Sequence, residues 1–387
     1  MKKFNAFLSR RQMIRSTAAA LAGLALTPWP SPESRWKSGS PRIPVLHVTD
    51  LYHPPQDPDD QLDLLTIAAL QELDLKGVVL DITRKFLEAA PAGFDIRRDP
   101  GFVPVTQLSY LLGRDIPAAM GPIVPLKSPG DTAADRPDRE QAGIRLLFDT
   151  LEGSSEPVVI TCTGSARVVA AAFNRRPELL RSKVRRVVLN AGATGGTKRE
   201  WNVGLDPAAY IGLWRSGLPV DWYPCATERS AFDQVNERGT YWKAKQEDLF
   251  RGISPSLRAW IAYSFSGSQR GDIIRVLSEE VDESVWKGVL SGERNLWSTG
   301  SIAMTANRVL GQTSEGWRFI PRSDAGSRET WPWRLDPIEA SVNEDAQIHW
   351  RLTEGGSRYR LFGRQAGKAY GSAMAEALNA LLKSLLA

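Results

Sequence analysis

Short apolar runs alternate with amphipathic stretches over the first half of the chain. The apolar runs are rich in β-branched residues, which favours buried strands, and they cover residues 43–50, 75–82, 116–121, 157–164 and 184–193. Between them, helical spacing of apolar positions predicts helices over residues 62–73, 141–151 and 165–180. Strands that alternate with helices form βαβ units. We therefore expect an α/β protein with a Rossmann-like, mainly parallel central sheet flanked by helices.

The carboxy-terminal half follows a different pattern. Residues 215–315 are rich in Trp and carry helical stretches at 256–265 and 273–290, which we interpret as a helical insertion. Residues 316–387 predict short strands and then a terminal helix. No break in composition forces a second domain, so we expect one domain over residues 43–387.

The amino terminus has the pattern of an export signal. Residues 1–30 contain five basic residues and no acidic one, and Arg10 and Arg11 precede a moderately apolar run. Paired arginines before such a run are typical of a twin-arginine signal peptide. The alternative is an amphipathic helix or a lipid-surface anchor. With a Ser- and Pro-rich linker at 31–42, this pattern predicts a periplasmic or secreted protein that the twin-arginine (Tat) machinery exports.

The net positive charge of the chain comes from this amino-terminal segment. The net charge is +5 over 387 residues, and the signal alone carries as many positive charges. The remainder is neutral, so we expect no general affinity for nucleic acid. No apolar stretch is long enough to predict a stable membrane span. The two cysteines, Cys162 and Cys225, are too few for a disulfide framework, and we expect two buried thiols.

Five carboxylates follow the first predicted strand within fourteen residues: Asp50, Asp57, Asp59, Asp60 and Asp63. Clustered carboxylates repel one another unless a cation neutralises them. A hard divalent cation with oxygen ligands solves this problem, and Ca²⁺ tolerates the irregular geometry of a loop. The spacing is not that of an EF-hand. The alternative is a solvated acidic turn at the start of the next helix, where acids favour the helix N-terminus.

Four blocks of sequence, in this order, resemble the inosine–uridine-preferring nucleoside hydrolases. They are Val-Thr-Asp (48–50) with Asp-Pro-Asp-Asp-Gln-Leu-Asp-Leu (57–64), Ile-Pro-Ala-Ala-Met-Gly (116–121), the stretch 161–193, and the stretch 199–214. The resemblance covers roughly residues 43–224. It implies the nucleoside hydrolase fold and a calcium-dependent hydrolase (a glycosidase) that cleaves N-glycosidic bonds in nucleosides or related ribosides.

The resemblance also implies roles for individual residues. Asp50, Asp60 and the backbone carbonyl of Thr163 would bind calcium. A metal-bound water would attack the sugar, with Asp50 as the base that takes its proton. Asp59 would contact the sugar.

Three further residues correspond to substrate-binding positions. Glu200 and Asn202 would hold ribose hydroxyls, and the alternative is a surface pair on a loop. Trp201 would line the pocket or belong to the core. An aromatic leaving group would stack on Trp242 or Trp297, and Tyr241 is a further candidate for this contact.

The chain also departs from the family pattern. The loop between Asp50 and Asp59 is longer, and we expect His53 within it to be solvated rather than to touch substrate. The family's late His-Asp pair aligns with residues 297–299, so the calcium-binding aspartate is absent there. Asp81 lies near the position of a family Asn.

These departures leave other functions open. A non-catalytic periplasmic binding protein on the same scaffold would not need the late aspartate. A hydrolase of another glycoside is a further alternative, and a metal-dependent phosphatase would need a basic group beside the acidic loop. The expected partner is a small-molecule riboside or other glycoside, and the sequence leaves homo-oligomers open.

Overall fold

The structure, a computed structural model, describes residues 41–87, 98–196 and 198–386. The predicted signal peptide at 1–30 lies outside the described residues, and so does the predicted linker at 31–42 except for its last two residues. Among the described helices, none is both long enough and apolar enough to span a membrane. The described residues belong to the unit that begins at residue 39.

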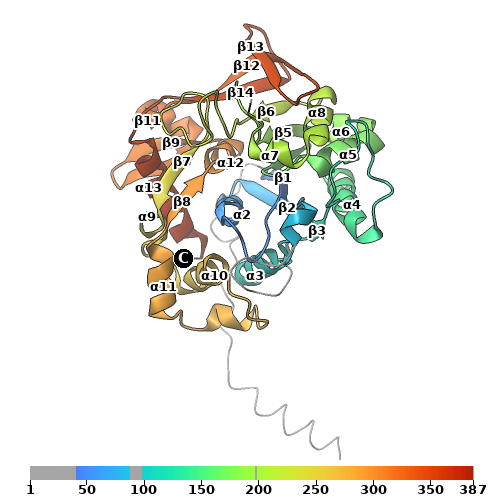
Figure 1. The fold of residues 1–387 in the computed structure, drawn as a ribbon. Coiled ribbons are helices and arrows are strands. Elements are labelled where there is room, and N and C mark those ends of the chain that lie inside the picture. Colours follow the sequence, from blue (N-terminus) through green and yellow to red (C-terminus); the bar gives the residue numbers. More distant parts are fainter. Residues whose placement is uncertain (1–40, 88–97, 197, 387) are drawn as a thin grey trace, which may run out of the picture. The chain divides into compact units, whose positions relative to one another are not determined.

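A nine-stranded sheet forms the centre of this unit, with the order β13-β12-β14-β6-β5-β4-β1-β2-β3 (Figure 1). From β3 to β6 all neighbouring strands are parallel. The strand order 3-2-1-4-5-6 is that of a doubly wound, Rossmann-like fold, which confirms the expected fold class. These strands are β1 (Ile43–Thr49), β2 (Leu73–Leu80), β3 (Ala118–Met120), β4 (Val158–Cys162), β5 (Val184–Leu189) and β6 (Val220–Trp222).

Three strands that follow much later in the chain extend this sheet. β14 pairs in parallel with β6, whereas β12 pairs antiparallel with both β14 and β13. The sequence predicted short strands here but not their place in the main sheet. Their bounds are β12 (Trp333–Val342), β13 (Ile348–Leu352) and β14 (Tyr359–Arg364).

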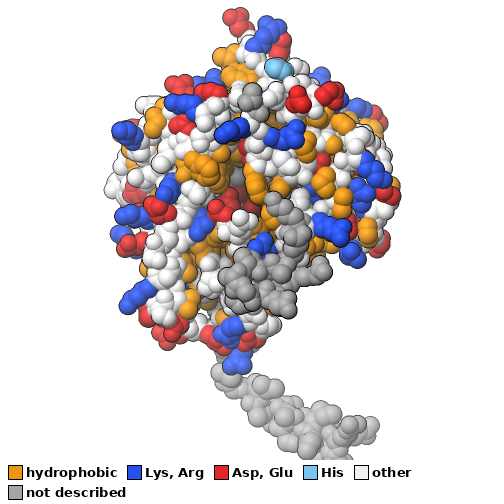
Figure 2. All heavy atoms as spheres, viewed as in Figure 1, with side chains coloured by type: hydrophobic (Ala, Val, Ile, Leu, Met, Phe, Trp, Pro, Cys, Tyr) orange, Lys and Arg blue, Asp and Glu red, His pale blue; other side chains and the backbone are white. Residues whose placement is uncertain are grey.

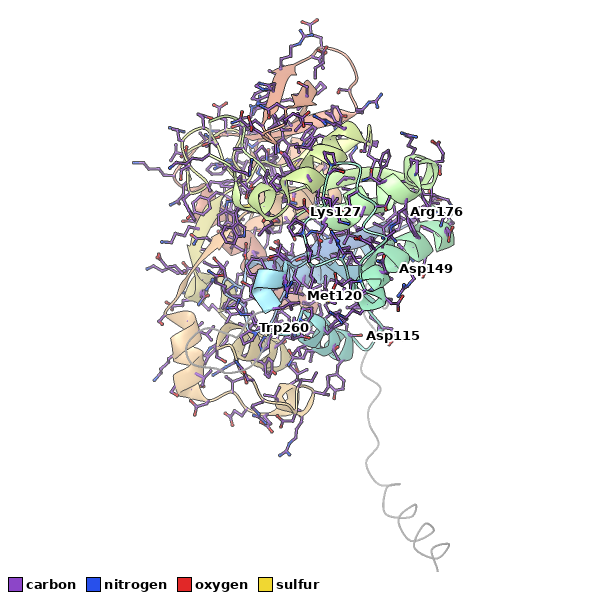
Figure 3. The ribbon with its side chains drawn as sticks, turned by 45° about the vertical axis from the view of Figure 1, so that its right-hand side comes forward. Asp115, Met120, Lys127, Asp149, Arg176 and Trp260 are labelled. Carbon is purple, nitrogen blue, oxygen red and sulfur yellow. The ribbon has the colours of Figure 1, made fainter. Side chains whose placement is uncertain are left out.

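Helices cover both faces of the sheet, because each strand of a parallel sheet carries apolar side chains on both sides. Val45 of β1 packs with one layer and Leu46 with the other. The first layer contains α2 (Asp59–Ala69), α3 (Phe102–Leu112), α12 (Thr299–Thr305) and α13 (Tyr370–Leu385). The second contains α4 (Asp138–Gly153), α5 (Arg167–Arg175), α6 (Pro177–Lys183) and α8 (Pro207–Arg215). Figure 3 shows Asp149 of α4 and the exposed Arg176 on the outer side of this second layer.

The helix predicted over residues 165–180 is in fact two helices. α5 ends at Arg175, and Pro177 begins α6, because proline suits the first turn of a helix but breaks its interior. The stretch predicted as helical over residues 273–290 is likewise divided, into a 3-10 helix at Arg275–Ser278 and a helix at Glu283–Leu290. The remaining predicted helices and strands are present, with ends that shift by a few residues.

The region predicted as a helical insertion is helical, with α9 (Gln246–Phe250), α10 (Pro255–Phe265), η3 (Arg275–Ser278) and α11 (Glu283–Leu290). That it is an insertion relative to the family stays a prediction. A two-stranded ribbon brackets it, β7 (Trp242–Lys245) and β8 (Glu293–Leu296). A small sheet follows, β9 (Arg308–Thr313), β10 (Gly316–Pro321) and β11 (Thr330–Trp331).

Charged side chains of both signs are mixed over the face shown in Figure 2. Many of them form exposed ion pairs, such as Arg176 with Glu152 and Arg215 with Glu344. This mixture agrees with the neutral balance expected after residue 30.

Candidate active site

The site lies where the strand order reverses, at the carboxyl ends of β1 and β4. This is the position at which open α/β sheets bind ligands. Asp50 directly follows β1 and Thr163 directly follows β4. Gly164 allows the two chain segments to pass closely, because a Cβ atom there would lie 3.2 Å from the Asp50 backbone nitrogen. The sheet topology thus brings together two of the three predicted calcium ligands.

The third predicted ligand, Asp60, joins them from the first turn of α2. Its Oδ1 atom accepts hydrogen bonds from the hydroxyls of Thr49 (2.7 Å) and Thr163 (3.0 Å). Its side chain also hydrogen-bonds that of Asp50. Asp59 and Asp63 lie on the same helix, one residue before and three residues after it. We call these four aspartates (Asp50, Asp59, Asp60 and Asp63) the carboxylate cluster.

Burial makes the carboxylate cluster an unusual electrostatic environment. Asp50 is 6% exposed and Asp63 is 2% exposed. Burial, and then the neighbouring carboxylates, raise the pKa of Asp50, Asp59 and Asp63 well above the ordinary value. Burial also raises the pKa of Asp60 to about 6, against the hydrogen bonds from its threonine partners. Within the described ranges, no lysine or arginine forms an ion pair with any of the four.

The fifth acid of the loop behaves differently. Asp57 forms an ion pair with Arg294 of β8, whose Nε atom also donates to Gln246 Oε1 at 3.1 Å. Asp57 thus ties the long loop after β1 to the β7–β8 ribbon. Its charge is already balanced.

The predicted substrate residues Glu200 and Asn202 come from the loop after β5 and from α7 (Trp201–Leu205). The Glu200 carboxylate caps α7, accepting from the backbone nitrogens of Asn202 (3.1 Å) and Val203 (3.3 Å). The Asn202 amide nitrogen donates to the carbonyls of Thr163 (3.0 Å) and Asn190 (2.9 Å). The alternative of a surface pair is therefore wrong, because both side chains hold backbone groups at the sheet edge.

A cavity of about 430 Å³ opens above the carboxylate cluster, within the range of small-molecule sites. Two aromatic groups form its walls. In one group Phe86 stacks between Tyr52 (ring centroids 4.9 Å apart) and Trp201 (6.2 Å). In the other group, Trp297 packs against Phe232 at 5.8 Å between ring centroids. All six predicted site residues near the carboxyl ends line this cavity, namely Asp50, Asp59, Asp60, Thr163, Glu200 and Asn202.

The three tryptophans that the sequence singled out have different outcomes. Trp201 is 55% exposed and lines the cavity, so it is not a core residue. Trp297 also lines the cavity, and its indole nitrogen donates to the carbonyl of Ala231. The prediction for Trp242 was wrong. Its side chain is 1% exposed and lies in the hydrophobic core, because alternate side chains of β7 point to opposite sides.

The expectation for His53 was also wrong. The ring is buried rather than solvated, it stacks on Tyr263, and its Nε2 atom donates to the carbonyl of Ser268 at 2.5 Å. The backbone of His53 also pairs with Asp99. His53 therefore anchors the long loop and does not line the cavity. Both cysteines are free and buried, as expected, and Cys225 lies at the cavity wall.

Sequence reasoning missed Tyr52, Phe86 and Phe232 as cavity residues, and it gave Asp63 no role of its own. Phe232 is 59% exposed, and an isolated aromatic in a loop carries no periodic signal that marks a site. Asp63 carried a signal that was overlooked. An acid at the buried face of an otherwise apolar helix is rarely structural.

A second buried group of charges lies beside the carboxylate cluster. Arg167 is fully buried, and its Nε atom donates to Asp206 Oδ2 at 2.8 Å. Asp81 accepts from the hydroxyl of Ser165 (2.8 Å) and the backbone nitrogen of Arg167 (3.2 Å). We call Arg167, Asp206, Asp81 and Ser165 the arginine-centred cluster. Asp206 also caps the start of α8, because its Oδ1 atom accepts from the backbone nitrogen of Ala209.

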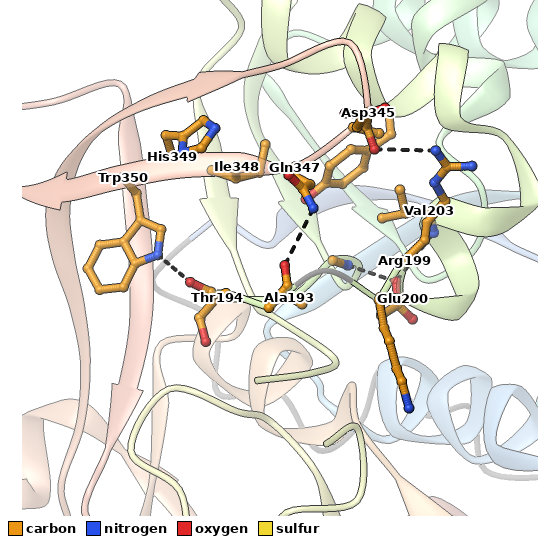
Figure 4. Close-up of a pocket in the computed structure, with 16 residues that line it drawn as sticks. Ala193, Thr194, Arg199, Glu200, Val203, Asp345, Gln347, Ile348, His349 and Trp350 are labelled. Atoms are coloured by element: carbon orange, nitrogen blue, oxygen red, sulfur yellow. Dashed lines mark hydrogen bonds between the residues drawn. The ribbon is translucent and has the colours of Figure 1, made fainter. Parts of the chain in front are cut away.

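A further cavity, of about 600 Å³, lies between the loop after β5 and the β12–β13 hairpin (Figure 4). Trp350 donates to the carbonyl of Thr194 at 2.9 Å, so the hairpin holds this loop. Glu200 lines both cavities and forms part of the wall between them. Lys198 and Arg199 lie at this cavity beside Asp345, so its lining charges are mixed.

The residues present fit a hard divalent cation in their chemistry. Buried carboxylates, hydroxyls and a backbone carbonyl are oxygen ligands of the kind that calcium prefers. One oxygen of Asp63, Oδ1, has no hydrogen-bond partner in the described part of the chain. No three side chains of His, Cys, Asp or Glu among the described residues form a complete metal-binding group, however. Asp50 and Asp60 with the Thr163 carbonyl would leave several coordination positions to water or substrate.

Curated sequences similar to this chain are pyrimidine-specific ribonucleoside hydrolases. The protein from Salmonella schwarzengrund is 31% identical over 199 residues, which covers 46% of this chain and 58% of the relative. Its counterpart from Salmonella paratyphi A is 28% identical over 198 residues, with the same coverage. The chain thus spans a little over half the length of the curated relatives it matches. No protein-family model matches the chain.

Solved structures with a similar fold include a purine-preferring ribonucleoside hydrolase from Gardnerella vaginalis, with a TM-score of 0.49, 14% identity, and coverage of 88% of this chain and 99% of that one. An inosine–uridine preferring nucleoside hydrolase from Bacillus anthracis gives a TM-score of 0.47, 14% identity, and coverage of 89% and 99%. Over these 199 residues, the chain is similar to pyrimidine-specific ribonucleoside hydrolases.

Proposed function

We propose that this protein is a hydrolase that cleaves the N-glycosidic bond of a nucleoside or a related riboside, and that its cofactor is Ca²⁺. The observation that carries the proposal is the carboxylate cluster at an aromatic-lined cavity, in which Asp50 and Asp63 are buried, Asp59 and Asp60 are half-buried, and none of the four forms an ion pair within the described residues. The similarity to ribonucleoside hydrolases over part of the chain supports it.

Asp50, Asp60 and the Thr163 carbonyl would hold the cation. When bound, the cation would lower the pKa of a water molecule and fix it near the sugar. Asp50 lies next to that position and would take the proton of the attacking water. The Thr163 carbonyl accepts one hydrogen bond from Asn202, which leaves its second lone pair for the cation.

The negative charge of the site suits the reaction. Cleavage of a glycosidic bond passes through an oxocarbenium-like transition state, whose positive charge nearby carboxylates stabilise. Asp59 lines the cavity without a positive partner among the described residues and would contact the sugar. The Asn202 nitrogen is engaged by two carbonyls, so its amide oxygen would accept from a sugar hydroxyl.

The aromatic walls favour a substrate with a planar leaving group. Trp201 and Trp297 both line this cavity, and each packs against another aromatic side chain that lines it. A nucleobase between such rings gains stacking energy of about 1–3 kcal/mol. Which base it carries follows from no residue described above.

A release assay tests the proposal directly. Purified protein is incubated with uridine, cytidine, inosine and adenosine, with and without a calcium chelator, and free base is measured by chromatography. We expect release of at least one base, its loss with the chelator, and its return with added calcium. Nucleoside binding without release would instead favour the alternative of a binding protein. No release combined with no calcium by elemental analysis would reject the proposal.

We also propose that the protein works in the periplasm or outside the cell, after export through the twin-arginine pathway. The basis is the Arg10–Arg11 pair before an apolar run. In a Gram-negative host, the full chain should accumulate in the periplasm, and the variant with both Arg10→Lys and Arg11→Lys should stay in the cytoplasm. Equal periplasmic amounts of the two would contradict the proposal.

A further inference from the structure

Asp63 is the most completely buried member of the carboxylate cluster, at 2% exposed. It lies one helical turn after Asp60 on α2, so both side chains lie on the same side of the helix. It lines the cavity together with Asp50 and Asp60. The Ser298 hydroxyl, from the segment after β8, hydrogen-bonds its carboxyl group.

The second oxygen of this carboxylate lacks a partner. Among the described residues, no donor reaches Asp63 Oδ1, although less than 1 Å² of that atom is exposed. A buried polar atom without a hydrogen bond costs on the order of 1–3 kcal/mol, so such atoms usually have a partner in the functional state. The charged neighbours of Asp63 are other carboxylates, which makes its environment worse rather than better.

Asp63 lines the cavity, so a donor or a cation bound there is the partner that the fold offers this carboxylate. Asp50, Asp60 and Asp63 do not together form a complete metal-binding group. A direct bond from all three to one ion is thus not the geometry found here. A water molecule in the hydration shell of the cation would satisfy Asp63 Oδ1 without that convergence.

We propose that Asp63 is an outer carboxylate of the cation site, which accepts a hydrogen bond from a cation-bound water and adds a third negative charge beside Asp50 and Asp60. This inference rests on the cation site of the proposed function. In this role, Asp63 increases the affinity of the site for a divalent cation. The proposal assigns no step of the reaction to this residue.

Calcium titration of the chelator-treated, full protein tests the role of Asp63 by calorimetry. Removal of an outer partner of a metal site costs about 10- to 100-fold in affinity, so Asp63→Asn should weaken calcium binding by that factor. Asp57→Asn is the matched control. Asp57 lines the same cavity but is paired with Arg294, so its loss should change the affinity less than threefold.

Thermal unfolding separates this role from a merely structural one. Without calcium, Asp63→Asn should melt at the same temperature as the wild type or higher, because the amide replaces a carboxyl group whose charged form burial and Asp60 already disfavour. With calcium, the rise in melting temperature should be smaller for Asp63→Asn than for the wild type. These two results together would support the assignment.

Two outcomes would overturn the inference, and they are distinguishable. If Asp63→Asn binds calcium within threefold of a wild type that itself binds, only the role of Asp63 is rejected. If the wild type binds no calcium, the proposed cation site fails as well.

Discussion

Two buried groups of aspartates lie side by side at the same edge of the sheet, and only one contains its own cation. In the arginine-centred cluster, the Arg167 guanidinium contacts Asp206, and it partly offsets the burial that raises the pKa of Asp81 to about 6. In the carboxylate cluster, no described cation lowers the pKa of Asp50 or Asp60. Buried charges persist in proteins only when paired or bound to metal. The difference therefore indicates which group is structural and which is completed by a ligand.

The largest expected effect comes from removing the internal cation. Arg167→Met keeps much of the side-chain volume but leaves Asp81 and Asp206 buried without a positive charge. The expected loss is about 3–5 kcal/mol of unfolding free energy, measured by urea denaturation. The matched control is Arg176→Met, because Arg176 pairs with Glu152 at the surface and should cost less than about 1 kcal/mol. Equal losses would mean that Arg167 does not act as a buried counter-ion.

The second effect concerns the carboxylate cluster, which a cation should stabilise from outside. At a concentration of calcium about 100 times the dissociation constant, the unfolding free energy should rise by about 2.7 kcal/mol. Asp60→Asn should remove this rise, because Asp60 is the central acceptor of the cluster. Arg167→Met, if it folds, should keep it. A calcium effect that survives in Asp60→Asn would contradict the assignment of the site.

The third effect is a dependence on pH that reverses with calcium. The pKa of Asp60 is raised to about 6 in the folded protein. A carboxyl group whose pKa is raised in the folded state contributes stability that is fully present below pH 4. This contribution is lost as the pH rises through about 6. Without calcium, stability should therefore fall between pH 4 and 7, by on the order of 2 kcal/mol for one such group.

Calcium binding requires deprotonated carboxylates, so the calcium-induced stabilisation should instead grow over the same range of pH. Melting curves at pH 5 and 7.5, each with calcium or with chelator, measure both trends. If calcium stabilises the protein equally at the two values, the titrating carboxylates are not its ligands.

The smallest effect on stability is expected at the rim of the cavity. Trp201 is 55% exposed, so Trp201→Ala should change the unfolding free energy by less than about 0.5 kcal/mol and leave calcium affinity unchanged. Its loss should weaken nucleoside binding, which equilibrium dialysis measures. A change in calcium affinity would show that the aromatic wall and the carboxylate cluster are not independent parts of the site.

Sequence reasoning could predict the parallel half of the molecule because its signals are local. Apolar runs and helical spacing gave β1, β2, β4 and β5 and the helices between them, and the order of the chemistry-bearing residues followed. Asp50 and Thr163 end neighbouring strands, so their meeting at one edge is a property of the topology. The Trp-rich half could not be read in the same way.

The errors share a physical cause, which is that side-chain direction and distant contacts leave little trace in local sequence. Tyr241 directly precedes β7 and Trp242 begins it, yet only Tyr241 packs on the cavity residue Trp297. The sequence around His53 is that of a solvated loop. In the fold, Ser268 and Tyr263, which are distant in the chain, contact its ring. Arg167 looks like an ordinary helix residue, and only the fold reveals that it neutralises buried acids.

The hairpin contact between Trp350 and Thr194 has a consequence for the time at which the site is completed. The two residues are 156 positions apart, and β14 must join β6 before the hairpin can hold the loop after β5. During synthesis the parallel core precedes this event, because chains fold from the amino terminus as they emerge. The loop that carries Glu200 therefore settles last, and a truncated chain that keeps the whole acidic region would still lack a finished pocket.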